Sequence, residues 1–515
     1  MRTRKTFTRE EWATFIFGLA LTFGLILRIF PGLSSGFPIN DGGMLYSMIR
    51  DLRSNGFVLP AFTTYNNSQI PFAYPPLGFY VAGILNLFGI SELTILHWLP
   101  ILVSIASIIV FYLFAGTLLA DRARGAAATL FFALTTGNYD WQIMGGGLTR
   151  SFGVFFFILS IYSVYRLFQS GTWKSVLLAG LFCSLAVLSH PEISLATAVS
   201  CALVWIFYGR TWKKTLHAFL VALIAVLLTA PWWGSVLAYH GPAPFLSVVR
   251  TGAYSESQLS MLLTAFFAPA ALFTLFGFLR IVGIVWGLSK RHFFLVVWAL
   301  LPYFAEPRSA GGISYFPSSL LIALAVTEAL PALLDWIRQK IGRAVSPRDF
   351  TQRGWLTIFL FAIVLYFFVT GVLFDFSLTN TSLKPPVPQE TMEWVRQNTP
   401  ADSQFFILTR NSGIMTDPIQ EWFPALTERH SQTTMQGLEW TLGEQFFPRL
   451  DAMILLQRCD DVTCVENWSS ENGLGFTHVL IEKSDRTKRL LIAFSNDGRY
   501  SLIYENSKYD VFQKQ

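Results

Sequence analysis

The sequence predicts a polytopic α-helical membrane protein with about eleven spanning helices, followed by a folded domain outside the membrane. The chain has 515 residues, of which 53% are hydrophobic and 14% charged, whereas a soluble globular protein carries about 25% charged residues. Apolar runs recur from Glu11 to Asp375. Many of them approach the ~20 residues that a helix needs to cross hydrocarbon with its backbone polar groups satisfied. This pattern excludes one large soluble core.

The predicted spans follow the apolar runs in order. They are Glu11–Phe30, Ile95–Leu119, Gly125–Asn138, Ser151–Phe168, Ser175–Ser189, Ile193–Tyr208, Thr215–Ala230, Leu259–Leu288, Phe293–Phe304, Tyr315–Ile337 and Trp355–Phe374. The runs that begin at Gly125 and Phe293 are short. Basic residues precede the first run as in a signal sequence, but that run is longer than the core of a cleavable signal. We therefore expect the first helix to be retained.

One further apolar segment, Tyr74–Ile90, decides the orientation, because counting it as a span would invert every later loop. If it does not cross, the loops on the side of the N-terminus hold most basic residues outside the tail. These are Arg2, Arg4, Lys5, Arg9, Arg122, Arg124, Arg166, Lys174, Arg210, Lys213, Lys214, Lys290, Arg291, Arg338, Lys340, Arg343, Arg348 and Arg353. The opposite loops hold only Arg50, Arg53, Arg150, Arg250 and Arg308. Tyr74–Ile90 is therefore predicted to be a re-entrant or interfacial pair of short helices.

Basic loops favour the cytoplasmic side of a membrane. We therefore predict a multi-pass plasma-membrane protein with a cytoplasmic N-terminus and an extracytoplasmic C-terminal domain. The net charge of +6 follows from these short loops, which is a sign of topology and not of a face that binds nucleic acid. No nucleic-acid partner is expected.

The chain divides into a membrane domain, residues 1–376, and an extracytoplasmic soluble domain, residues 377–515. In the first outer loop, residues 31–94, the stretch Met44–Asn55 alternates apolar and charged residues at helical spacing, which is typical of a helix lying flat on the membrane. The tail begins with a linker, Leu383–Pro388. Helices are then predicted at Glu390–Gln397, Gly443–Arg458 and Arg486–Phe494, and strands at Phe405–Leu408, His478–Ile481 and Ser501–Tyr504. This alternation indicates a small α/β or α+β domain, in which Cys459 and Cys464 either pair or remain free thiols.

Polar residues that packing does not readily explain fall on the predicted outer side. Ionisable residues at membrane depth are costly, and they usually face a cavity or a partner. We therefore expect one outward-facing cleft, and the candidate site residues are Asp41, Tyr74, Asp140, Arg150, His190, Glu192 and Arg308. If these side chains lie far apart in the structure, the hypothesis of a single active site fails.

Asp41 heads this group because it follows the first span, and the two glycines after it leave the backbone free to approach a ligand. Its carboxylate can act as a general base toward a hydroxyl or hold a cation. It can equally cap the helix that follows, since Asp is a favoured N-cap residue. Arg150 can bind a ligand or extend toward the headgroups. Arg28 can pair with an acidic group at the outer end of the first helix or with lipid headgroups, and we expect the headgroups. Gly145-Gly146-Gly147 is expected to permit close backbone packing.

The order and spacing of several features resemble the GT-C superfamily of membrane glycosyltransferases, which includes protein O-mannosyltransferases, lipid A aminoarabinose transferases and oligosaccharyltransferase catalytic subunits. These features are Asp41 in the first outer loop, the flat helix after it, the segment Tyr74-Pro75-Pro76-Leu77, and many spans followed by an outer domain. The tail segments Glu393–Pro400 and Glu421–Arg429 are similar to segments of bacterial members. The resemblance covers most of the chain.

The resemblance implies a sugar donor carried on a polyprenyl phosphate, with Asp41 activating the acceptor. Arg150 and Arg308 would then bind the lipid phosphate, which arginine recognises by paired hydrogen bonds, and Asp140 would match a second acidic position. No D-x-D pair is present in that loop, so we expect no cofactor, and a divalent metal has no support from this motif. Trp232-Trp233 is followed by Gly234 and Ser235, not by the sequon-reading motif, which argues against N-glycosylation of proteins.

These observations predict an enzyme that transfers a sugar from a polyprenyl-phosphate donor to a lipid, glycan or protein acceptor at the outer face of the membrane, among membrane lipids as its surroundings. The alternative is a non-catalytic membrane protein with a similar fold, either a transporter or a scaffold for envelope assembly. A transporter should show internal symmetry and broken helices near the midplane. The sequence has no visible repeat, and its polar groups gather at one face, which favours the enzyme.

Overall fold

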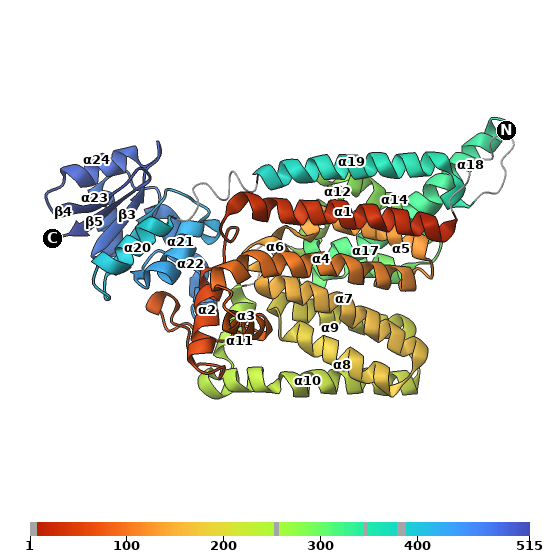
Figure 1. Ribbon diagram of the computed structural model, residues 1–515, viewed down its shortest axis with the longest axis horizontal. Helices are drawn as coiled ribbons and strands as arrows, with labels where there is room; N and C mark the ends of the chain where they lie inside the picture. The colour runs from red at the N-terminus through yellow and green to blue at the C-terminus, as the bar shows by residue number, and fades with distance from the viewer. Residues whose placement is uncertain (1–7, 252–256, 344–348, 378–387) are drawn as a thin grey trace.

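The computed structural model describes residues 8–251, 257–343, 349–377 and 388–515. A bundle of long, roughly aligned helices forms the larger part of the molecule, and a smaller domain with a β-sheet lies at one end of it (Figure 1). The chain starts at the opposite end of the bundle (Figure 1). The predicted fold class, a polytopic helical protein with a C-terminal α/β or α+β domain, is confirmed.

Among the described residues, seven helices are long and apolar enough to cross a membrane. They are α1 (Arg9–Ser35), α4 (Glu92–Leu118), α7 (Gly147–Ser170), α9 (Pro191–Tyr208), α10 (Trp212–His240), the continuous stretch Ala310–Lys340 and α19 (Gly354–Ser377). Two further predicted spans form shorter helices, α5 (Arg122–Leu134) and α8 (Trp173–Val187). The number of about eleven spans therefore stays a prediction.

Two of the predicted spans are divided at prolines, and a third changes its helical form beside one. Leu259–Leu288 is divided into α12 (Gln258–Phe267), α13 (Pro269–Leu272) and α14 (Leu275–Ser289), and Phe293–Phe304 into α15 (Phe293–Leu300) and α16 (Pro302–Ala305). Tyr315–Ile337 corresponds to α17 (Ala310–Leu324) and α18 (Leu330–Lys340), which a π-helical turn at Ala325–Ala329 joins. A proline lacks the N–H that an α-helix needs in its interior, and Pro269, Pro302 and Pro331 each stand in the first turn of a new helix.

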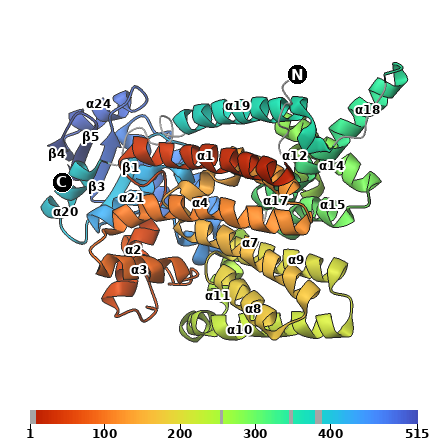
Figure 2. The same ribbon diagram turned by 45° about the vertical axis from the view of Figure 1, so that its right-hand side comes forward.

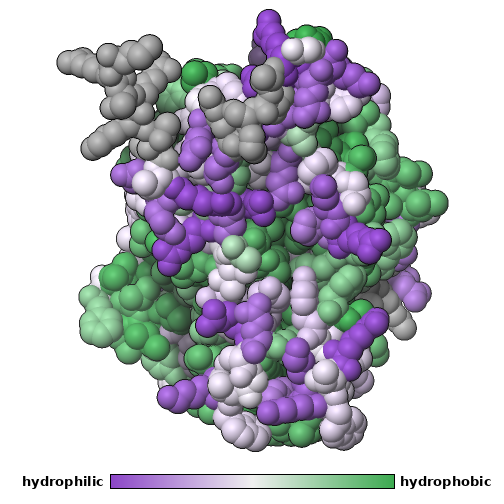
Figure 3. All heavy atoms as spheres, turned by 90° about the vertical axis from the view of Figure 1, so that its right-hand side faces the viewer, coloured by the Kyte–Doolittle hydropathy of each residue, from purple (hydrophilic) through white to green (hydrophobic). Residues whose placement is uncertain are grey.

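The basic loops that are predicted to be cytoplasmic meet at the end of the bundle where α1 begins. Arg9 contacts Asp121 and also lies 2.8 Å from Asp349, and Arg124 lies 3.1 Å from Glu328. Hydrophilic side chains gather over this end, whereas hydrophobic ones cover its flanks (Figure 3). The loops predicted to share one side of the membrane are thus together. Which side they face stays a prediction, and Arg2, Arg4, Lys5 and Arg348 lie outside the described residues.

Arg28 does not contact lipid headgroups, so this prediction was wrong. The side chain is fully buried, with its guanidinium 4.5 Å from the ring centre of Tyr139. Its Nε donates to Ser104 Oγ at 3.0 Å, and another guanidinium nitrogen donates to the carbonyl oxygen of Ala133 at 2.8 Å. The arginine thus joins α1 to α4 and α5, although its Nη2 has no hydrogen-bond partner among the described residues. Its position in a long apolar run did not indicate this inward orientation.

The first outer loop folds across the end of the bundle. It contains α2 (Gly43–Ser54) and α3 (Leu77–Leu87), and α2 lies across the direction of the bundle helices (Figure 1). With 11 residues, α3 is about 16 Å long, which is about half the thickness of the hydrocarbon core. The helix is thus too short to cross, as predicted for Tyr74–Ile90, although this segment forms one helix and not a pair.

The C-terminal domain is built on a five-stranded mixed sheet in the order β2-β1-β3-β5-β4. Its strands are β1 (Gln404–Leu408), β2 (His430–Ser431), β3 (His478–Glu482), β4 (Tyr500–Glu505) and β5 (Tyr509–Lys514). β1 is parallel to β2 and β3, whereas β5 is antiparallel to β3 and β4. The helices α20 (Gln389–Asn398), α22 (Phe446–Leu456) and α24 (Lys488–Asn496) correspond to the three predicted ones. The view in Figure 2 shows the sheet with α24 on its outer side.

Four elements of this domain were not predicted, namely α21 (Pro418–Thr427), α23 (Val462–Asn472), β2 and β5. Cys459 and Cys464 form a disulfide, which settles the two alternatives for this pair. The predicted linker lies outside the described residues except for Pro388. The unpredicted helix α21 contacts α2 and is one of the elements that dock the domain on the bundle.

The contact between α21 and α2 is unusually close because of a glycine. A Cβ atom placed on Gly43 would lie 2.5 Å from the carbonyl oxygen of Glu421. The indole N–H of Trp422 donates to the carbonyl oxygen of Asn40 at 2.9 Å, and the Tyr65 hydroxyl donates to the carbonyl oxygen of Glu421 at 2.7 Å. The two glycines after Asp41 thus make room for α21, whereas the sequence predicted that they make room for a ligand.

We predict that Gly43→Ala weakens the docking of the C-terminal domain. The added methyl group has to push α21 away, an overpacking cost of about 1–3 kcal/mol, so the melting temperature of the purified protein in detergent should fall. Gly18→Ala is the matched control, because nothing lies within 4 Å of a Cβ atom at that position. Equal melting temperatures for both variants would contradict the close contact.

Candidate active site

A cavity of about 240 Å³ lies between the segment 137–142, α7 and the start of α17. Asp140, Arg150 and Arg308 line it, together with Trp141 and Tyr315. These residues come from α6 (Asp140–Ile143), α7, the segment before α17, and α17 itself. Three of the seven predicted site residues therefore share one cavity, and the other four are connected to them by direct contacts or by charge.

Glu192 joins the two arginines. It stands in the first turn of α9, behind Pro191, and its Oε1 lies 2.9 Å from Arg308 Nε. Its Oε2 lies 3.5 Å from Arg150 and accepts a hydrogen bond from Ser309 Oγ. One carboxylate thus holds two guanidinium groups that still reach the cavity. The alternative in which Arg150 only extends toward the headgroups does not describe this geometry.

Asp41 lies at the other end of the group, and it does not cap α2. The residue at the N-cap position is Gly42 with a φ of 131°, and Asp41 Oδ1 accepts the backbone N–H of Gly146 at 2.8 Å. Burial raises the pKa of Asp41, while this hydrogen bond and the charge of Arg150 oppose the increase. The glycine run permits the approach, because a Cβ atom on Gly146 would collide with the carboxylate. The close packing expected of Gly145-Gly146-Gly147 is confirmed.

Glu421 of the C-terminal domain completes the surroundings of Asp41. Its Oε1 accepts the backbone N–H groups of Gly42 at 3.0 Å and of Met44 at 3.4 Å, so it caps α2 from another domain. The residue is 6% exposed. Burial, and then the charge of Asp41, raise the pKa of Glu421 well above its ordinary value. Burial and the charge of Asp41 therefore both favour the protonated form of Glu421, whereas its two hydrogen bonds to the α2 backbone favour the charged form.

Sequence reasoning missed Glu421 as a site residue. The segment Glu421–Arg429 was noted only for its resemblance to bacterial proteins, and nothing local indicated that its acid would meet a residue nearly 400 positions earlier. One signal was present, since Glu421 is the single charged residue in the stretch Pro418–Leu426. A second acid that was missed is Glu439, whose pKa burial raises and the charge of Arg308 lowers.

Tyr74 and His190 pack against each other, within electrostatic reach of Arg150, Glu192 and Arg308. Their ring centres are 6.0 Å apart, and the ring of Trp440 from the C-terminal domain lies 5.8 Å from that of Tyr74. His190 is 4% exposed, and burial, followed by the charge of Arg150, lowers its pKa to about 3. The imidazole is therefore neutral at pH 7. It can exchange hydrogen bonds with a ligand, but it does not carry a positive charge for a phosphate.

Asp140 faces the cavity from the start of α6, where its carboxylate accepts the backbone N–H of Trp141 at 2.8 Å. Burial raises the pKa of Asp140 to about 6, against this hydrogen bond and the charge of Arg150. Burial likewise raises the pKa of Tyr74 to about 12. The structure thus brings all seven predicted residues into one connected group.

Metal binding is not settled by this group. Within the part of the chain that the structure describes, no three His, Cys, Asp or Glu side chains converge on a position where they could hold a metal ion. The expectation that the protein needs no cofactor therefore stays a prediction.

Comparisons with known proteins agree on one fold. The sequence model of the dolichyl-phosphate-mannose-protein mannosyltransferase family matches residues 73–234, a range that includes five of the predicted site residues, namely Tyr74, Asp140, Arg150, His190 and Glu192. The oligosaccharyltransferase AglB from Archaeoglobus fulgidus, in complex with an inhibitory peptide and a dolichol-phosphate, superposes with a TM-score of 0.60 at 13% identity. The alignment covers 92% of this chain and 69% of AglB.

A second solved structure is of similar size to this chain. ArnT from Cupriavidus metallidurans bound to undecaprenyl phosphate superposes with a TM-score of 0.54 at 13% identity, and the alignment covers 98% of both chains. None of the curated proteins matches in sequence. At 13% sequence identity, the likeness to AglB and ArnT shows a shared fold and nothing more.

We predict that Glu421 acts as a neutral acid. Glu421→Gln keeps an oxygen that accepts from the α2 backbone, so the melting temperature at pH 7 should stay close to that of the wild type. Glu421→Ala leaves buried N–H groups without an acceptor, which should cost about 1–3 kcal/mol. Thermal unfolding of the three purified proteins in one detergent decides the point. If Gln is as damaging as Ala, the residue carries its charge in the folded protein.

Proposed function

We propose that this chain, whose fold is like those of AglB and ArnT, transfers a sugar from a polyprenyl-phosphate donor to an acceptor at the outer face of the membrane. The observation that carries the proposal is the connected group itself. A buried acid, Asp41, lies within electrostatic reach of Arg150, which lines a cavity together with Arg308. This arrangement provides a proton acceptor on one side and cations for a phosphate on the other.

Asp41 is the general base in this proposal. A carboxylate with a raised pKa removes a proton at neutral pH more effectively than an ordinary aspartate. The acceptor hydroxyl attacks the anomeric carbon, and its proton passes to Asp41. The bond between that carbon and the phosphate oxygen breaks, and the polyprenyl phosphate leaves with the electron pair. Because attack and departure are in line, the configuration at the anomeric carbon inverts.

Arg150 and Arg308 stabilise the departing phosphate. Guanidinium groups bind phosphate through paired hydrogen bonds, and they contribute most where charge develops in the transition state. Glu192 holds both arginines in place, and its negative charge has to be outweighed when the phosphate arrives. Dolichol-phosphate in AglB and undecaprenyl phosphate in ArnT support a donor of this class.

The acceptor is a lipid, a glycan or a protein side chain other than a sequon asparagine, because Trp232-Trp233-Gly234-Ser235 departs from the sequon-reading motif. The lipid tail of the donor and the surrounding membrane lipids are the remaining partners, and nucleic acid is not among them. Asp140 lines the cavity with a pKa near neutrality, which suits a group that binds sugar hydroxyls.

We predict that Asp41→Asn lowers sugar transfer by a factor of about 10²–10⁴, which is the contribution of a general base. Transfer from a polyprenyl-phosphate sugar, or hydrolysis of that donor, is measured with purified protein. Asp485→Asn, an exposed aspartate in the C-terminal domain, is the control and should keep the full rate. Equal rates for Asp41→Asn and the wild type would remove Asp41 from the mechanism. Absence of transfer in all three would favour the non-catalytic alternative.

The outer location of the site follows from the predicted orientation. A reporter enzyme that works only outside the cytoplasm, fused after Gln515, should be active. A matched fusion after Tyr208, at the end of α9 nearer the N-terminal side of the bundle, should be inactive. The reverse result would place the site on the cytoplasmic side and contradict outer-face transfer.

A further inference from the structure

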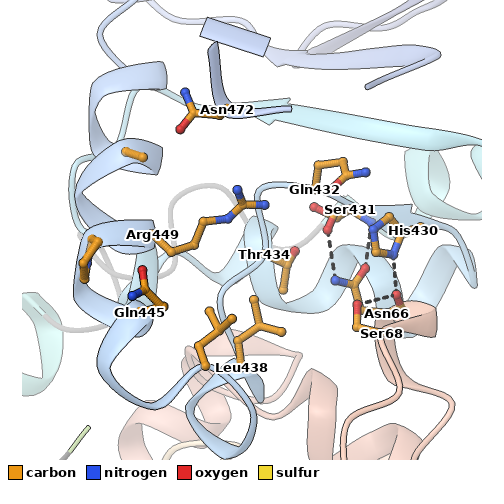
Figure 4. Close-up of a pocket in the computed structure, with 13 residues that line it drawn as sticks. Asn66, Ser68, His430, Ser431, Gln432, Thr434, Leu438, Gln445, Arg449 and Asn472 are labelled. Carbon is orange, nitrogen blue, oxygen red and sulfur yellow. Dashed lines mark hydrogen bonds between the residues drawn. The ribbon is translucent and has the colours of Figure 1, made fainter. Parts of the chain in front are cut away.

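A second cavity, of about 440 Å³, opens between the C-terminal domain and the first outer loop. Arg449, His430, Gln432, Thr434 and Asn472 give it polar walls, and Asn66 and Ser68 of the outer loop close one side (Figure 4). It is larger than the cavity that holds Arg150 and Arg308. None of the seven predicted site residues lines it, so the proposed reaction does not explain it.

The wall opposite Arg449 is held rigidly by hydrogen bonds. The amide of Asn66 donates to the carbonyl oxygen of Ser431 at 2.9 Å and accepts the backbone N–H of the same residue at 2.7 Å. His430 Nδ1 lies 2.5 Å from the carbonyl oxygen of Asn66, so this nitrogen is the donor. Thr434 and Gln432 are hydrogen-bonded to Gln420 and Gln404. These groups keep their positions without a ligand.

Arg449 differs from every other polar group described in this cavity. It stands in the first turn of α22, and its guanidinium extends across the cavity toward Ser431 and Thr434 (Figure 4). Burial lowers the pKa of Arg449, and among the described residues no carboxylate opposes this effect. The described lining contains no Asp or Glu either. A half-buried cation without an anion is costly, and an anionic ligand would remove that cost.

The cavity and the catalytic group share one short segment. Residues Leu438–Trp440 form a single 3₁₀ turn. Leu438 lines the second cavity, whereas the next residue, Glu439, is within electrostatic reach of Arg308. Trp440 in turn packs against Tyr74. A ligand in the second cavity therefore lies against the same turn that borders the proposed reaction centre.

We propose that this cavity binds an acidic saccharide, with Arg449 pairing with a carboxylate or phosphate on the sugar and the fixed amides and His430 bonding to its hydroxyls. Resting on the proposed function, the inference names the class of acceptor as a negatively charged glycan. A cation would be repelled by the charge of Arg449, and a lipid tail would leave that charge without an anion. Both are therefore disfavoured by the lining.

The test measures binding and not transfer. The full-length protein in nanodiscs made of zwitterionic lipid is titrated with tetragalacturonate by calorimetry, with cellotetraose as the uncharged saccharide and inorganic phosphate as the bare anion. We expect tetragalacturonate to bind and Arg449→Gln to weaken it at least about tenfold, the effect of losing a charge-assisted hydrogen bond. Arg489→Gln, an exposed arginine on α24, is the matched control and should bind like the wild type.

Three outcomes would overturn the inference. They are equal binding of the charged and the uncharged tetrasaccharide, phosphate binding as tight as tetragalacturonate, and tetragalacturonate binding that Arg449→Gln leaves unchanged. Asp41→Asn separates this inference from the proposed reaction, since that variant should lose transfer and still bind the saccharide. Circular dichroism of Arg449→Gln, together with tetragalacturonate titration of Arg449→Lys, which keeps the charge, excludes loss of folding as the cause.

Discussion

The carboxyl group of Glu421 accepts two backbone N–H groups at the start of α2, and much of the molecule is organised around this contact. The first turn of any helix has N–H groups that lack partners within the helix. In most proteins a neighbouring side chain satisfies them, but here the acceptor comes from a separate domain. Because the same acid lies beside Asp41, the contact joins the domains and also sets the electrostatic surroundings of the proposed base.

The charged residues of the site form two sets of interactions, and Arg150 belongs to both. Glu192 holds Arg150 and Arg308, while Asp41 lies within reach of Arg150 and of Glu421. A change at any one of these residues therefore alters the charge state of its neighbours. Substitutions in this group are expected to be non-additive, since residues in one ion-pair network are energetically coupled.

Most of the fold could be predicted from the sequence, because each membrane-spanning helix requires an apolar run of sufficient length. The same rule failed where prolines divided a continuous apolar run, as at Pro269 and Pro302, since hydropathy does not register a missing N–H. In the C-terminal domain β5 was missed because its alternation is short and ends at the chain terminus. The identity of the candidate site residues was likewise accessible, because ionisable groups in apolar surroundings are conspicuous.

Which side chains contact each other could not be predicted from the sequence. Three contacts depend on tertiary geometry alone. Glu192 holds two arginines, Arg28 turns inward onto Tyr139, and Glu421 lies near Asp41. Residues from distant parts of the chain meet only after the bundle and the outer domain have packed. Local pattern also cannot distinguish a glycine that admits a ligand from one, such as Gly43, that admits a helix.

The separation of Gly42 and Glu421 along the chain has a consequence for biosynthesis. The two residues are 379 positions apart, and a ribosome adds about 5–20 residues per second. The start of α2 therefore waits roughly 20–80 seconds for its acceptor, and during that interval the bundle is inserted with its end uncovered. A nascent or prematurely terminated chain that ends before Glu421 has Asp41 and the arginines but not the acid beside them. The whole group therefore assembles only after Glu421 has been synthesised.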